Sequence, residues 1–384
     1  MASSARSVRG TNHFSSRCAL ALLAFSAVVS MPAVAQANVG TPLMWAGALH
    51  MLFGNACIGV LEGVILALVF KVPSVRSVPL MILANYFSAW VGWAWLIPLL
   101  EARIHFDLYN TWGWLWKMTA IAYALTLLFE WPFVAAGMFR TPYWVKRSLP
   151  ALLVTQTASY ALIFGWYYMA SGTSLYSRMA VVPIEDVPLP ENVLVYFLGE
   201  RDGDAYCCDP CTGKVEKVRE LHSTREEDCL LLNGPHGNTW NVTAWLEPRG
   251  DNDEEPVVLS DIDDSLVPHH LPEQCDWRRR SSAWNFGDVP QLGKSGNSPW
   301  RFRSGNWPIQ GLHGENLKSG EVFSCSLDTP FASWAVRNAT QLPNGQVVFQ
   351  LGRRQICVVA PETRRIALLS FGRGPIAILK PAMD

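Results

Sequence analysis

Charge is distributed very unevenly along this chain of 384 residues, and this constrains the fold more than any other feature. Of the 63 charged residues, 49 follow Gly172, whereas residues 43–170 hold only 11. Charged side chains are strongly disfavoured in hydrocarbon, so the first part suits lipid and the second suits water. The sequence therefore predicts a membrane domain followed by a water-soluble domain, with a boundary near residue 171.

Four apolar segments in the first part are long enough to cross a bilayer. They cover residues 43–70, 78–100, 113–138 and 149–169, and charged residues or proline bound each of them. A hydrocarbon core about 30 Å thick takes roughly 20 residues of helix. Four such runs in succession favour a transmembrane four-helix bundle at residues 38–170 over the buried helices of a soluble protein.

An earlier apolar run predicts an export signal. Three arginines precede a run of about 12 apolar residues that begins at Cys18, and small residues surround Ala35 and Ala37. This order is typical of a secretory signal peptide, which we assign to residues 1–37. The alternative is an uncleaved signal anchor.

The positions of basic residues predict how the bundle is oriented. The loop after the first segment carries Lys71 and Arg76, and the loop after the third carries Arg140, Lys146 and Arg147. Lysine and arginine concentrate in cytoplasmic loops, and tryptophan and tyrosine gather near the predicted outer ends of the segments. We therefore expect a multi-pass protein of the cell membrane with an extracytoplasmic C-terminal domain.

Each apolar segment carries one strongly polar residue at a similar depth. These residues are Glu62, Asn85, Glu130 and Gln156, and each lies nine or ten positions from a basic residue on the predicted inner side. At the rise of an α-helix this is about 13–15 Å, close to the bilayer midplane. The pattern predicts a polar layer of two carboxyl and two amide groups.

Two interpretations of this layer remain open. Polar side chains inside a bilayer can act as interhelical hydrogen-bond glue. Ionisable residues there are also candidates for proton, ion or ligand binding. His50 and Asn55 lie further out along the first segment and could extend a polar path.

The second part of the chain predicts an all-β domain. Residues 171–192 read as a proline-containing linker, and residues 193–384 contain short runs rich in β-branched and aromatic residues that often end in glycine. No helical pattern follows Asp186. The fold class is therefore α + β, with a transmembrane bundle followed by an outer β domain.

A weak internal repeat suggests how this domain is built. Residues 206–215 align with residues 357–366, and residues 320–330 are a further partial copy. The turn at residues 209–213 resembles the hairpin of many β-propeller blades. A blade takes about 40–50 residues, so at most four would fit. We expect a propeller-like set of blades, with a β-sandwich as the alternative.

Seven of the nine cysteines lie in the second part. An exported domain can form disulfides, but their pairing cannot be deduced from sequence. Cys208 and Cys211 form a C-x-x-C pair beside Cys207, and Cys229 follows. We interpret these four as ordinary or disulfide-bonded cysteines; a metal site and thiol redox chemistry are the alternatives.

The sequence names no activity. It contains no phosphate-binding loop, dinucleotide fingerprint or hydrolase motif, so no cofactor is expected. The net charge of −1 predicts no nucleic-acid partner. The first hypothesis is a non-enzymatic, membrane-anchored binding or sensing protein whose β domain contacts a protein or envelope ligand. The alternatives are a proton- or ion-coupled permease component using Glu62 and Glu130, and a thiol-dependent envelope enzyme.

Overall fold

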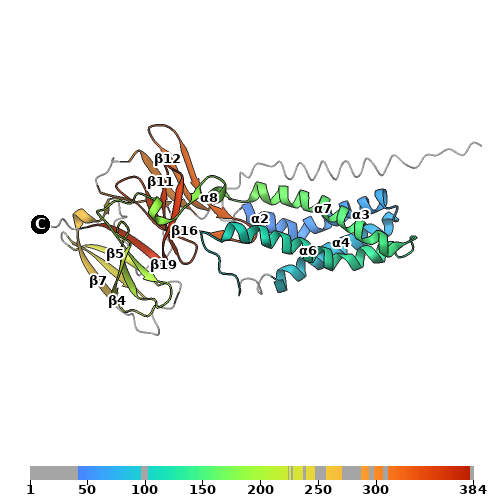
Figure 1. The fold of residues 1–384 in the computed structure, drawn as a ribbon, viewed down its shortest axis with the longest axis horizontal. Helices are drawn as coiled ribbons and strands as arrows, with labels where there is room; N and C mark the ends of the chain where they lie inside the picture. The colour runs from blue at the N-terminus through green and yellow to red at the C-terminus, as the bar shows by residue number, and fades with distance from the viewer. Residues whose placement is uncertain are drawn as a thin grey trace, which may run out of the picture. The chain divides into compact units, whose positions relative to one another are not determined.

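The fold is described from a computed structural model of the chain. The structure describes residues 42–96, 103–223, 225, 228–236, 239–246, 257–269, 287–293, 298–305 and 310–380. The predicted signal peptide at residues 1–37 lies outside these residues. Helices come first along the chain and strands follow (Figure 1), so the predicted order of a helical part and a β part is confirmed.

The helices in the first part match the predicted apolar segments. The elements are α2 (Pro42–Leu49), the π-helical turn η1 (His50–Gly54), α3 (Asn55–Val69), α4 (Ser74–Val91), the π-helical turn η2 (Gly92–Leu96), α6 (Thr111–Met138) and α7 (Trp144–Ala170). Three continuous helices are long and apolar enough to cross a membrane: Pro42–Val69, Thr111–Met138 and Trp144–Ala170.

Of the four predicted spanning segments, three are therefore confirmed as candidate membrane helices in the described part of the chain. The second segment forms the shorter helix α4, whose first turn holds Arg76 between two serines and whose middle holds Asn85. These polar residues lower its apolar character. Residues 97–100 of that segment lie outside the described residues.

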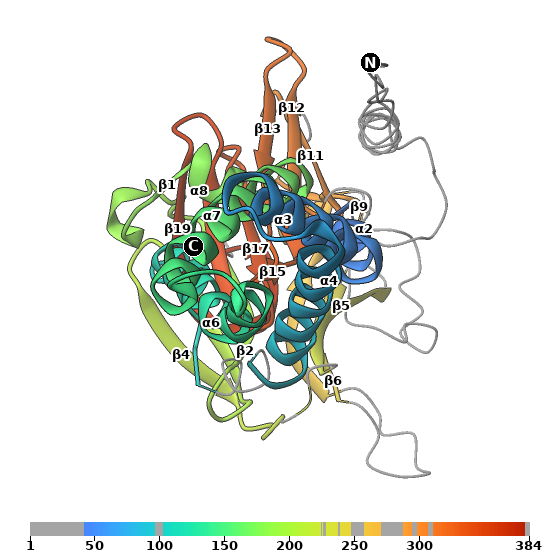
Figure 2. The same ribbon diagram turned by 90° about the vertical axis from the view of Figure 1, so that its right-hand side faces the viewer.

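Helices α3, α4, α6 and α7 pack around a common centre, which is visible nearly end-on in Figure 2. Two glycines bring α3 and α4 close together. A Cβ atom on Gly59 would lie 2.5 Å from the Ile82 backbone, and one on Gly63 would lie 2.6 Å from the Val78 Cα atom. Larger residues at these two positions would force the helices apart.

The second part consists mainly of strands. After α8 (Ser174–Ser177) come β1 (Ala180–Val181), the 3-10 turn η3 (Ile184–Asp186), β2 (Val193–Gly199), β3 (Ala205–Asp209), β4 (Lys214–Arg219), β5 (Cys229–His236), β6 (Thr239–Trp245), β7 (Val257–Asp263), the 3-10 turn η4 (Asp264–Leu266), β8 (Pro268–His269), β9 (Gly287–Asp288), β10 (Gln291–Leu292), β11 (Trp300–Gly305), β12 (Gly311–Asn316), β13 (Val322–Cys325), β14 (Leu327–Asp328), β15 (Ser333–Trp334), β16 (Val336–Gln341), β17 (Val347–Leu351), β18 (Gln355–Ala360) and β19 (Arg365–Leu379).

One large sheet dominates the β domain and curls into half a barrel. Its strand order is β4-β3-β2-β19-β18-β17-β16-β10-β8, and β1 pairs with β19 beside this path. Three smaller sheets have the orders β13-β12-β11-β9, β5-β6-β7 and β14-β15. Strands β5–β7 contribute to one hydrophobic core with β2 and β19, and strands β11–β13 contribute to another with β16–β18.

Separate propeller blades are not seen among the described strands. The two aligned sequence repeats do form similar hairpins, β3–β4 and β18–β19. However, the long strand β19 pairs with β18 through its first half and with β2 through its second half. The two hairpin units are thereby joined edge to edge in one sheet, which replaces the predicted blades.

The segment predicted as a linker is packed against the β domain. Leu175 of α8 is fully buried in the core that also contains Phe302 and Phe349. Strand β1 pairs with β19 in parallel. Residues 171–192 therefore include regular elements that belong structurally to the β domain.

A loop of the helical part also enters this core. Leu108, just before α6, is fully buried among the same apolar side chains. Its N–H donates to Gln355 Oε1 at 2.6 Å, and the Tyr176 hydroxyl donates to its carbonyl oxygen at 2.8 Å. Trp112 in the first turn of α6 stacks on Tyr176 with a centroid distance of 5.4 Å.

Candidate functional site

Four helices each direct a polar side chain into the centre of the bundle. Glu62 comes from α3, Asn85 from α4, Glu130 from α6 and Gln156 from α7. Both glutamates are 0% exposed, Gln156 is 1% exposed and Asn85 is 6% exposed. The four residues that the sequence placed at one depth thus lie together.

Gln156 connects the two carboxyl groups. Its Nε2 atom donates to Glu62 Oε1 at 2.9 Å and to Glu130 Oε2 at 2.5 Å. Since an amide nitrogen carries two hydrogens, these two bonds use its full donor capacity. The carboxyl groups therefore lie on either side of a single nitrogen atom.

Helix α4 supplies a donor to the other oxygen of each carboxyl group. Asn85 Nδ2 donates to Glu62 Oε2 at 2.6 Å and to the Met81 carbonyl at 2.9 Å. Ser88 Oγ donates to Glu130 Oε1 at 2.6 Å. All four carboxyl oxygens consequently accept a hydrogen bond from a neutral donor.

Sequence reasoning missed the contribution of Ser88. It noted Ser88 only as a small residue that permits close packing. A usable signal was its spacing, because Ser88 lies three residues after Asn85 and so projects from the same face of the helix.

No basic side chain in the described part of the chain forms an ion pair with Glu62 or Glu130. Two ionised carboxylates buried without a positive partner would be strongly unfavourable. The arrangement is therefore suited to hold one positive charge, whether a proton or a cation.

His50 and Asn55 lie further along the same helical segment. His50, in η1, places its Nδ1 atom 2.8 Å from the Tyr167 hydroxyl of α7. The buried Asn55 amide is 3.5 Å from the carbonyl of Met51, in its own helix. Neither is joined to the Glu62 cluster by a hydrogen bond between described residues. The polar path remains a hypothesis, although π-helical turns often occur at functional sites.

Cys208 and Cys211 of the predicted C-x-x-C motif, and the adjacent Cys207, lie in different surroundings. Cys207 and Cys208 are neighbours on β3, so their side chains face opposite sides of the sheet. Cys208 is buried in one core cluster, Cys207 packs against another, and Cys211 is exposed in the following turn. These three thiols are free, and Cys229 is buried at the start of β5.

This arrangement does not favour thiol or metal chemistry. Burial raises the pKa of Cys208 to about 11 and also raises the pKa of Cys207, so both are disfavoured as thiolates. Within the described residues, no group of three or more His, Cys, Asp or Glu side chains is placed to hold a metal ion.

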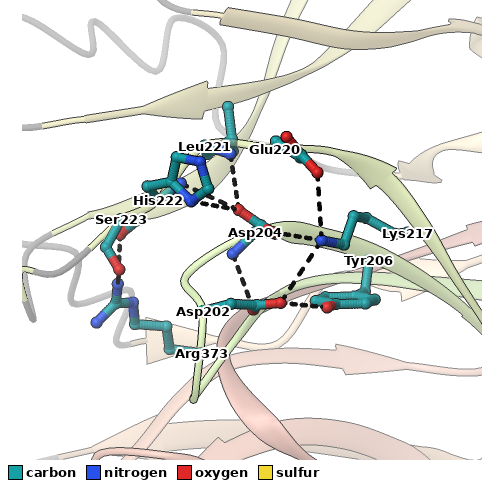
Figure 3. Close-up of polar contacts among 9 residues, drawn as sticks. All are labelled: Asp202, Asp204, Tyr206, Lys217, Glu220, Leu221, His222, Ser223 and Arg373. Carbon is teal, nitrogen blue, oxygen red and sulfur yellow. Dashed lines mark hydrogen bonds and ion pairs between the residues drawn. The ribbon is translucent and has the colours of Figure 1, made fainter.

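A second polar network, which sequence reasoning missed, surrounds the buried Asp204 (Figure 3). Asp204 Oδ2 accepts from Lys217 Nζ at 2.7 Å, and Oδ1 accepts from the N–H groups of Leu221 and His222 at 2.9 and 3.1 Å. The hydrogen bond from Lys217 and these two backbone donors lower the pKa of Asp204.

This network fixes two loops against each other. Gly203 has φ +69°, and a Cβ atom there would lie 1.8 Å from the Ser223 carbonyl oxygen. Arg373 Nη2 donates to the same carbonyl at 3.0 Å. The saturation of Asp204 by partners of its own chain indicates a structural role. The sequence contains no spacing motif that predicts this network, because the partners of Asp204 come from β4 and the loop that follows it.

Comparison with protein-family models and with curated protein sequences finds no match to this chain.

Proposed function

We propose that this chain is a multi-pass membrane protein whose helix bundle reversibly binds a proton or a small cation between Glu62 and Glu130. The observation that carries the proposal is the position of Gln156, whose amide nitrogen donates to both carboxyl groups in the buried centre of the bundle. A change in charge at one glutamate therefore alters the hydrogen bonding of the other through the shared Gln156 nitrogen.

The chemistry of the cluster favours this role over packing alone. Interhelical glue needs only neutral groups such as amides and hydroxyls. Two carboxyl groups within the apolar helices carry a much higher cost, which a bound positive charge would offset. The absence of an ion-pair partner for either glutamate, among the residues that the structure describes, supports a charge supplied from outside the protein.

The C-terminal β domain would then serve as the binding or sensing part, outside the cytoplasm. The basic loops at Lys71 and Arg76 and at Lys146 and Arg147 support this orientation. The two core clusters made of β-domain residues support a folded domain that could present a binding surface. A partner of this surface would be a protein or an envelope component.

Charge-neutral substitution of both glutamates tests the proposed site. The purified full-length protein is reconstituted in liposomes, and uptake of protons, sodium and potassium is measured for the wild type and for Glu62→Gln/Glu130→Gln. We expect the wild type to take up one of these ions and the double variant to lose this uptake, because glutamine cannot balance a positive charge.

Glu321→Gln is the matched control, because this glutamate is exposed in the β domain and pairs with Arg364. It should retain wild-type uptake. Equal uptake by the wild type and the double variant, with both proteins folded, would contradict the proposed site.

A further inference from the structure

The four carboxyl oxygens of the cluster differ in the kind of atom that bonds to them. Glu62 Oε1 and Glu130 Oε2 both accept from the Gln156 nitrogen, and Glu62 Oε2 accepts from the Asn85 nitrogen. Glu130 Oε1 instead accepts from a hydroxyl group, Ser88 Oγ, at 2.6 Å. An amide nitrogen can only donate a hydrogen bond, whereas a hydroxyl group can also accept one. Of these four hydrogen bonds, only the one at Glu130 Oε1 can reverse its direction.

The two amide nitrogens already use both of their hydrogens. The Asn85 nitrogen donates to the Met81 carbonyl at 2.9 Å as well as to Glu62, and the Gln156 nitrogen donates to both glutamates. A proton added to an oxygen that faces one of these nitrogens would meet a second hydrogen and find no acceptor. Burial without an acceptor is costly, so these three oxygens are poor places for a proton.

Ser88 has two acceptors for one hydrogen. Its Oγ atom lies 2.6 Å from Glu130 Oε1 and 3.1 Å from the Asn85 carbonyl oxygen of its own helix. A serine hydroxyl carries a single hydrogen and donates it to one of the two at a time. Bonds from serine to a carbonyl of the preceding helical turn are common. The hydroxyl therefore has another acceptor within reach when Glu130 needs no donor.

We infer that the positive charge held by the cluster is one proton on Glu130 Oε1, with Ser88 as its hydrogen-bond acceptor; this rests on the function proposed above. The protonated oxygen donates to Ser88 Oγ, and the Ser88 hydrogen turns to the Asn85 carbonyl. Each of these groups keeps a partner in both states. A metal cation fits less well, because it needs several oxygen ligands at once and the Gln156 nitrogen bonds to both carboxyl groups.

The binding step balances without a further reactant. A hydronium ion supplies the proton: one of its O–H bonds breaks, an O–H bond forms on Glu130 Oε1, and water is released. No electrons are exchanged. Ser88 keeps its own hydrogen and only rotates its hydroxyl group, so it positions the proton and does not transfer it.

The titratable groups near Glu130 define where else the proton can reside. Glu62 faces it from α3 across the Gln156 nitrogen. Tyr160 lies one turn beyond Gln156 on α7, and its hydroxyl is bonded to Thr126 at 2.9 Å. The group that faces Glu130 from α4 is Ser88, which does not titrate at ordinary pH. Glu62 is therefore the competing site.

Ser159 is the hydroxyl group that could serve a proton on Glu62. It lies beside Glu62 on α7, and its Oγ atom donates to the Gln156 carbonyl at 3.1 Å. The 2.6 Å contact between Ser88 and Glu130 is a stronger hydrogen bond than this one. The two sites for the proton thus depend on different serines, and removal of each serine distinguishes them.

Infrared spectroscopy of the purified full-length protein tests where the proton lies. Spectra are recorded between about pH 6 and pH 9, where exposed carboxyl groups are ionised. Dodecyl maltoside micelles are used because this detergent has no C=O group of its own. We expect a C=O band of a protonated carboxyl group, which Glu62→Gln/Glu130→Gln loses. Ser88→Ala should shift this band to higher wavenumber, since the O–H group loses its acceptor.

Three further variants complete the comparison. Ser88→Cys keeps a weakly accepting side chain and replaces Ser88→Ala if that variant does not fold. Thr119→Val is the matched control, because the Thr119 hydroxyl bonds only to the Leu115 carbonyl of its own helix; the band should stay in place. Ser159→Ala should also leave it in place. A band that shifts in Ser159→Ala but not in Ser88→Ala would put the proton on Glu62 and overturn the inference.

The outcomes separate this inference from the proposed function. If the band is absent while uptake of sodium or potassium depends on the two glutamates, the carboxyl site stands and the proton is refuted. A band that is present but indifferent to Ser88→Ala refutes the role of Ser88 and leaves the site intact. Unchanged ion uptake in Glu62→Gln/Glu130→Gln, together with an absent band, refutes both.

Discussion

At the scale of single residues, the polar centre of the bundle shows what spacing can reveal. Counting from the basic loops predicted one polar side chain per helix at a common depth, and Glu62, Asn85, Glu130 and Gln156 do meet. The counting could not show which atoms pair. That Gln156 bonds to both carboxyl groups depends on helix rotation, which packing throughout the bundle determines.

Asp204 provides a prediction at the same scale. Asp204→Asn removes the negative charge that faces Lys217 and weakens the hydrogen bonds from the Leu221 and His222 N–H groups. We expect the melting temperature of the β domain at neutral pH to fall by a few degrees. Thermal unfolding of the full-length protein measures the melting temperature. Hydrogen exchange of the backbone amides in residues 202–223 shows whether the change is located at this network.

The pH dependence of Asp204 has a defined sign. Because its pKa is lower in the folded protein than in the unfolded chain, its ionised form stabilises the fold above the ordinary aspartate value. This stabilisation is lost as the pH falls through the lower, folded value. The loss on acidification should be smaller in Asp204→Asn, whereas the exposed Glu220→Gln should behave like the wild type. Identical acid profiles for Asp204→Asn and the wild type would be inconsistent with this account.

At the scale of elements, the contact between α3 and α4 determines whether the carboxyl cluster can assemble. Gly59 and Gly63 let the α4 backbone approach, and Asn85 reaches Glu62 across this same contact. Small residues at helix interfaces allow such close approach in membrane proteins. Helix spacing and the geometry of the polar site are therefore linked.

Gly59→Ala tests this link. The added Cβ atom would lie 2.5 Å from the Ile82 backbone, so the helices must separate. We expect a loss of about 1–3 kcal/mol in the free energy of unfolding, measured by denaturation in mixed micelles. Gly165→Ala on α7 is the matched control, because nothing lies within 4 Å of its added Cβ atom. Equal stability of the two variants would show that the α3–α4 contact can relax at little cost.

The strands show the limit of local sequence patterns. The repeat at residues 206–215 and 357–366 predicted two similar hairpins, and β3–β4 and β18–β19 are such hairpins. The error was in what joins them. Strand β19 extends past its pairing with β18 to meet β2, and no local residue pattern specifies a partner that far away in sequence.

At the scale of the whole molecule, the sequence predicts how the protein is oriented in the membrane. The basic loops predict that the residues after α7 lie outside the cytoplasm. A reporter enzyme that is active only in the cytoplasm, fused after Asp384, should therefore be inactive. A fusion of the same reporter at Thr141, between α6 and α7, should be active. The reverse pattern would require the opposite orientation.

Leu108 has a consequence for how the protein is made. Gln355, whose side-chain oxygen accepts from the Leu108 N–H, is synthesised 247 residues later. The core that encloses Leu108 also contains strands from the end of the chain. Leu108 is therefore synthesised long before the strands that bury it. The helical part alone cannot bury this loop, because its burial requires the C-terminal strands. The change in composition near residue 171 is therefore not a boundary in the packing, because one core contains residues from both sides of it.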